Sequence, residues 1–145
     1  MGLSEHNRNT FLINLHKLIE EAAHNTATDI LHARIKQLEY PPNGGLTEAE
    51  AIAVQKLQGD ETLRDALRKL IASNSAGVLF NVLNILDGTG NPDPGTGDWS
   101  EVKLVDCAED DEGDDEMLHD GFFETYWEWK KRRRSNWKLD IVDGD

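Results

Sequence analysis

The chain has 145 residues, of which 38% are hydrophobic, and its formal net charge is −13. This length suffices for one domain with a real core, and the composition is not that of a disordered chain. A single cysteine, Cys107, excludes an intramolecular disulfide, and the negative charge disfavours nucleic acid and anionic membrane surfaces as partners.

Residues 7–87 are predicted to form a helical body. Apolar residues recur at helical spacing from Phe11 onward, which predicts a first helix near 8–24 and a second near 27–39. The run Tyr40-Pro-Pro-Asn-Gly-Gly45 ends this part, because two prolines and two glycines cannot continue a helix.

Three further helices are expected in the same body. The run Thr47-Glu-Ala-Glu50 matches a capping box and predicts a third helix that ends near Gln58. Asp60 can cap a fourth helix. The fifth, near 76–86, is apolar around most of its circumference, which indicates the central helix of the domain. This apolar stretch is too short to span a bilayer, so no membrane association is expected.

The rest of the chain is predicted to contain the only β structure. A Gly/Pro loop over 88–98 precedes a segment over 99–142, in which residues 101–106 and 137–142 alternate like short strands. The two strands could pair around the helix between them. The expected fold is therefore mainly α, with five to six helices and a small two-stranded β element near the C-terminus, in a single domain over 1–145.

An acidic run and an aromatic helix are the most informative part of the chain. Eight of the eleven residues over 106–116 are acidic, and an aromatic helix with a basic end follows. Its aromatic residues spread over about half of the circumference, whereas a docked helix needs a stripe of about 100°. Either all of them pack, or part of this face remains for a partner. The predicted partner contacts are Glu109, Asp110, Asp111, Glu112, Asp114, Asp115, Glu116, Tyr126, Trp127 and Trp129.

A metal or ligand site is the alternative interpretation of the acidic side chains. The loop resembles a calcium-binding loop only poorly, because Pro92 stands where glycine is expected and Asp98 where glutamate is expected. No metal or other cofactor is predicted in the leading interpretation. The residues that the alternative would use are Asp87, Asp93, Asp98, His119 and Asp120.

The composition favours a small acidic cytoplasmic protein that binds a basic protein partner and thereby inhibits or regulates it. The absence of a catalytic motif favours a role other than catalysis. In charge and size the C-terminal half resembles the small acidic immunity proteins that neutralise bacterial toxins, which implies a bacterial inhibitor; no residue motif carries this likeness. The alternatives are a metal-dependent hydrolase or small-ligand-binding domain, and a homodimer paired through its aromatic face.

Overall fold

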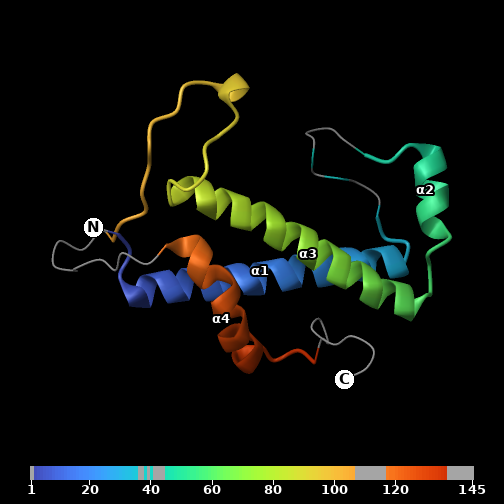
Figure 1. The fold of residues 1–145 in the computed structure, drawn as a ribbon. Helices are drawn as coiled ribbons and strands as arrows, with labels where there is room; N and C mark the ends of the chain where they lie inside the picture. The colour runs from blue at the N-terminus through green and yellow to red at the C-terminus, as the bar shows by residue number, and fades with distance from the viewer. Residues whose placement is uncertain (1, 36–37, 39, 41–44, 107–116, 137–145) are drawn as a thin grey trace. The chain divides into compact units, whose positions relative to one another are not determined.

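The computed structural model describes residues 2–35, 38, 40, 45–106 and 117–136. In this part of the chain the secondary structure consists of α-helices and one short 3-10 turn (Figure 1). The elements are α1 (Glu5–Leu31), α2 (Glu48–Gln55), α3 (Glu61–Leu86), η1 (Pro94–Thr96) and α4 (Leu118–Arg132).

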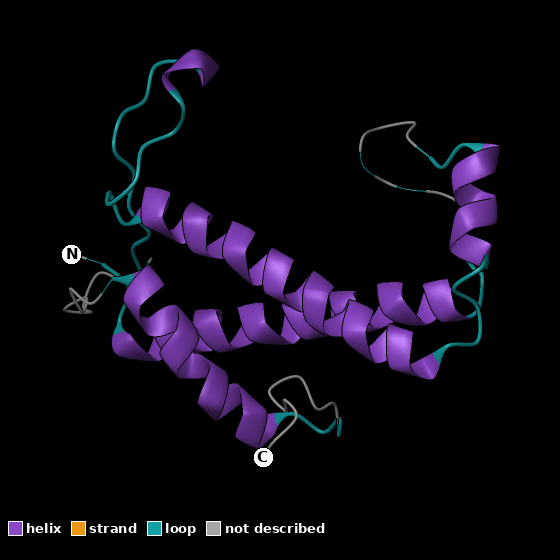
Figure 2. Cartoon of the chain, turned by 45° about the vertical axis from the view of Figure 1, so that its right-hand side comes forward, coloured by secondary structure: helices purple, strands orange, loops and turns teal. Residues whose placement is uncertain are grey.

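The predicted fold class is wrong in two respects. The described residues form four α-helices instead of five or six, and none of them belongs to a β-strand (Figure 2). Residues 101–106 do not pair as a strand, and the proposed partner strand over 137–142 lies outside the described residues. The mainly α character itself is confirmed.

The helix count is lower because two expected interruptions do not occur. Helix α1 continues through the polar stretch 24–29, and α3 continues through Ser73-Asn-Ser75. Neither stretch contains proline or glycine, and Asn, Ser and Thr each cost a helix only about 0.5 kcal/mol relative to alanine. Helix α2 begins with the predicted capping box, in which Thr47 and Glu50 each bond the other's backbone N–H.

The structure divides into two compact units. The first comprises residues 1–19 and 74–137, and the second comprises residues 20–73 and 138–145. Helices α1 and α3 each contribute one part to each unit. The prediction of a single domain over 1–145 stays a prediction.

The first unit contains most of the apolar core. Side chains from α1, α3 and α4 are buried there: Leu12, Ile13, Leu15, Ile19, Leu83, Leu118 and Phe122. The N-terminus of α1 is held by Ser4, whose hydroxyl accepts the Asn7 N–H, and by Asp106, whose carboxylate accepts the Ser4 N–H at 3.1 Å. A residue near the end of the described loop therefore fixes the start of the first helix.

The second unit has a smaller core. Its buried apolar residues are Ala23, Ala27 and Leu31, which recur every four residues on one face of α1. The Gly59 N–H donates to the Leu31 carbonyl at 3.0 Å and joins the turn before α3 to the end of α1. Helix α2 buries none of its residues. This unit depends on close helix contact through alanine more than on large apolar side chains.

Helix α3 is not the buried central helix that its sequence suggests. Of its most apolar 18-residue stretch only 6% is buried, and Leu70, Val78 and Val82 are exposed. By length and composition alone α3 could cross a membrane, because the helix extends well beyond the stretch 76–86. A single such helix is weak evidence for membrane insertion.

The continuity of α3 can be tested at Asn74, an exposed residue near its middle. We expect Asn74→Ala to raise the free energy of unfolding by about 0.5 kcal/mol, because alanine is the better helix former, and Asn74→Pro to lower it by about 3 kcal/mol. Urea denaturation followed by circular dichroism measures both. A break at this position would instead leave the proline variant as stable as the wild type.

Candidate functional site

The start of α4 is set by a residue at the end of α3. Helix α3 ends where Gly88 adopts a left-handed conformation (φ 72°), after which the Thr89 and Gly90 N–H groups both donate to the Asn84 carbonyl. Asp87, just before this turn, accepts the Leu118 N–H at 3.1 Å and the His119 N–H at 2.8 Å. Because Met117 supplies no side-chain cap, Asp87 caps α4 from a distant part of the chain.

The same carboxylate also binds the His119 ring. Asp87 Oδ2 lies 2.7 Å from His119 Nδ1, and His119 Nε2 lies 3.3 Å from Asp120 Oδ1. The Asp87 side chain is 8% exposed, so its negative charge is held by the backbone N–H groups, the helix N-terminus and the imidazole. Both of its oxygens are occupied by these structural contacts.

A second histidine joins α1 to the buried side of α4. His16 Nε2 lies 2.6 Å from the Phe122 carbonyl oxygen and 3.2 Å from Thr125 Oγ1. Since a carbonyl can only accept, Nε2 carries the proton. The ring stacks on Phe122, with centroids 4.8 Å apart, and meets Tyr126 edge-on. Burial lowers the pKa of His16, and the Phe122 carbonyl partly opposes this shift.

The opposite side of α4 carries exposed aromatic residues. Phe123 is 56% exposed and Trp127, one turn further along, is 58% exposed. Lys130 Nζ lies 5.6 Å from the centre of the Trp127 ring, at cation–π distance. Phe123 also stacks on Phe80 of α3 with a centroid separation of 5.4 Å, which fixes its position. We call Phe123, Trp127 and Lys130 the α4 aromatic surface.

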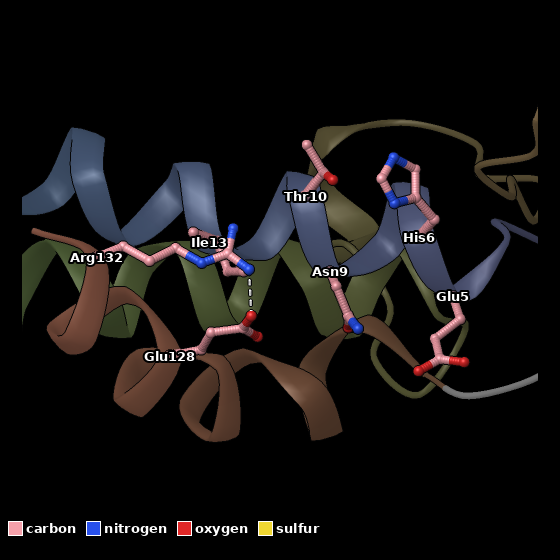
Figure 3. A pocket seen from close by; sticks show the side chains of 7 residues that line it. All are labelled: Glu5, His6, Asn9, Thr10, Ile13, Glu128 and Arg132. Carbon is pink, nitrogen blue, oxygen red and sulfur yellow. Dashed lines mark hydrogen bonds and ion pairs between the residues drawn. The ribbon is translucent and has the colours of Figure 1, made fainter.

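A polar hollow lies between the N-terminal part of α1 and the C-terminal half of α4, both in the first unit (Figure 3). Its volume is about 340 Å³, and an ion pair between Glu128 and Arg132 forms one end of it. The two residues have the i, i+4 spacing that favours ion pairs on a helix surface. Ile13 is the only apolar residue in the lining, which consists of Glu5, His6, Asn9, Thr10, Ile13, Glu128 and Arg132.

The predicted partner contacts fall into two groups. The seven acidic positions Glu109, Asp110, Asp111, Glu112, Asp114, Asp115 and Glu116 lie outside the described residues. Of the three aromatic residues, Trp127 is exposed, whereas Tyr126 and Trp129 are partly buried. Phe123, which is not among the predicted contacts, is as exposed as Trp127.

The residues of the metal alternative do not converge. Asp87, His119 and Asp120 come together, but Asp87 is committed to the α4 N-terminus. Asp93 accepts the Gly95 N–H at 2.7 Å within the η1 turn, and Asp98 is exposed. Among the described residues no group of three or more His, Cys, Asp or Glu side chains could hold a metal ion.

Comparison with known proteins gives no family for the chain. No family model, no curated protein and no solved structure matches it.

Two features of the site are not visible in the sequence pattern. The capping role of Asp87 joins positions that are 31 residues apart, and local spacing predicts only short-range caps. The burial of His16 could be anticipated because Leu12 lies four residues before it and Ile19 three residues after it, and residues three and four apart share a helix face. Its partner on α4 could not be.

The role of Asp87 predicts a specific loss of stability. We expect Asp87→Ala to lower the free energy of unfolding by about 2 kcal/mol, because two backbone N–H groups at the start of α4 lose their acceptor. Urea denaturation measures this loss. The matched control is Asp98→Ala, which removes an exposed carboxylate from the following loop and is expected to change stability by less than about 0.5 kcal/mol. Equal effects of the two substitutions would contradict the capping role.

The buried His16 predicts a loss of stability in acid. Its pKa in the folded protein lies below the ordinary value of 6.5, so the unfolded chain binds the proton more readily. The contribution of His16 is therefore present at neutral pH and is lost as the pH falls below 6.5, with a slope of at most about 1.4 kcal/mol per pH unit.

Nuclear magnetic resonance titration of the His16 ring tests this, with the urea-unfolded protein as the reference. Urea denaturation of His16→Gln between pH 7 and 5 should show a flatter pH dependence than the wild type. A His16 pKa equal to that of the unfolded chain would refute the assignment.

Proposed function

We propose that this chain is a protein-binding module whose anchor is the α4 aromatic surface. The observation that carries the proposal is that Phe123 and Trp127, two large aromatic residues, are more than half exposed on one side of a helix whose other side is buried. Tryptophan is enriched among the residues that dominate binding energy at protein interfaces. Exposed aromatic clusters of this kind are uncommon on isolated soluble proteins.

The charge of the chain indicates the character of the partner. Residues 76–145 contain 18 Asp and Glu against seven Lys and Arg, and the acidic run 106–116 directly precedes α4 in the sequence. Such an excess attracts a basic surface and speeds its association, most strongly at low salt. The proposed partner is therefore a basic protein, and an inhibitory or regulatory effect on that partner is the proposed consequence.

We propose the cytoplasm as the cellular location of this protein. A partner-binding role in the cytoplasm is consistent with a single cysteine and with the high charge of the chain. In the first unit the C-terminal half of α3 contributes Leu83 to the core and Phe80 to the contact with Phe123, so moving this helix into a bilayer would disrupt both. The metal-dependent hydrolase has no comparable support in the described part of the structure.

Affinity capture with matched tryptophan variants tests the proposal. The tagged wild type, Trp127→Ala and Trp99→Ala are incubated with lysate of the source cells and washed at low and then at high salt. We expect the wild type and Trp99→Ala to capture a basic protein in stoichiometric amount, because Trp99 is 44% exposed but lies in the loop that follows η1 and not in α4. Trp127→Ala should capture much less of this protein, because truncation of a tryptophan anchor lowers the binding free energy by about 2 kcal/mol or more.

High salt should reduce the amount retained by the wild type, because screening weakens attraction between exposed charges. Equal capture by all three proteins would remove the α4 aromatic surface from the interaction. Capture of no protein at either salt would argue against the proposed function as a whole.

A further inference from the structure

The charges on the exposed side of α4 are arranged with opposite signs at its two ends. Asp120 lies in the first turn and its side chain is 66% exposed, whereas Lys130 lies in the last turn and is also exposed. At 100° per residue, Asp120, Phe123, Trp127 and Lys130 fall within an arc of about 80°. From the N-terminal to the C-terminal end, this exposed stripe therefore carries an acidic residue, two aromatic residues and a basic residue.

The same stripe on an antiparallel copy of α4 is complementary in charge to this one. If a second α4 lies antiparallel across the first, with the two-fold axis at position 125, position 120 faces position 130 and position 123 faces position 127. Asp120 of each copy then meets Lys130 of the other, and Phe123 meets Trp127. A parallel arrangement would instead place Asp120 against Asp120 and Lys130 against Lys130, which like charges oppose.

We propose that the α4 aromatic surface pairs with the same surface of a second copy of this chain, in an antiparallel two-fold arrangement. The order of the charges supports a second copy as an occupant of this surface, because a two-fold interface requires a self-complementary patch. Aromatic pairs such as Phe123 with Trp127 strengthen such a contact beyond the area that they bury.

The dimer is weak and depends on concentration. Two helices of 15 residues bury less than the roughly 1,200 Å² at which stable specific interfaces begin. This inference rests on the proposed function only in using the same surface. Self-pairing and docking of a basic partner exclude each other, so the partner dissociates the dimer.

Charge-swapped variants test the pairing by sedimentation velocity, at protein concentrations from about 10 to about 500 µM. The variants are Lys130→Glu and Asp120→Lys, and circular dichroism verifies that each remains folded. We expect the sedimentation coefficient of the wild type to rise with concentration. Each variant alone should dimerise at least about tenfold more weakly, because like charges then face each other at both ends of the pair.

An equimolar mixture of the two variants is the decisive sample. In a mixed pair, Asp120 of the Lys130→Glu chain faces Lys130 of the Asp120→Lys chain, and the two introduced charges, which are opposite in sign, face each other at the other end. We therefore expect the mixture to recover the association of the wild type at low salt and to lose part of it at high salt. Trp127→Ala should associate more weakly than Trp99→Ala, because only the former residue lies in the interface.

Three results would overturn the inference. If the wild type stays monomeric over the whole concentration range, self-pairing is rejected. The proposed function is then tested separately by the capture experiment. Variants that associate as strongly as the wild type place the dimer on another surface, such as the exposed apolar residues of α3. A mixture that fails to recover association rejects the pairing of positions 120 and 130.

Discussion

The binding of Asp87 to the start of α4 is the interaction on which the first unit depends. It joins the end of α3 to a helix that begins after a long connection, and it does so with backbone N–H groups that would otherwise lack an acceptor. With the helix start fixed, Phe122 reaches the core beside His16, and the next residue, Phe123, is left on the outside.

His16 and Asp87 hold α4 by different kinds of force. Asp87 is an anion at a helix N-terminus, where the peptide dipoles stabilise negative charge. His16 is an uncharged ring inside an apolar contact, with one N–H that satisfies the Phe122 carbonyl. The first contact fixes where α4 begins, and the second fixes which side faces α1. Together they explain why a helix rich in aromatic residues buries only part of them.

The amino-acid sequence was sufficient to predict structural features that depend only on residues close together in the chain. The capping box at Thr47 depends on residues three positions apart, and it is confirmed. The expected separation of a first helix from a second near residues 24–27, and of a fourth helix from a fifth before residue 76, did not occur, because polar residues weaken a helix without ending it. The expectation that α3 is central failed because apolar composition does not reveal which neighbours are present. The contacts of Asp87 and His16 join distant positions, so no periodicity could predict them.

The loop over 88–105 has both of its ends fixed by carboxylates. Asp87 holds one end at the start of α4, and Asp106 holds the other at the start of α1. Because these anchors are set by helix termini, the length of chain between them affects the fold only through closure entropy, which rises by about 0.6 kcal/mol for each doubling. The part of this loop that follows the Thr89 and Gly90 contacts with α3 is therefore the place where the protein can accept inserted sequence, such as a fluorescent reporter, without disturbing either helix.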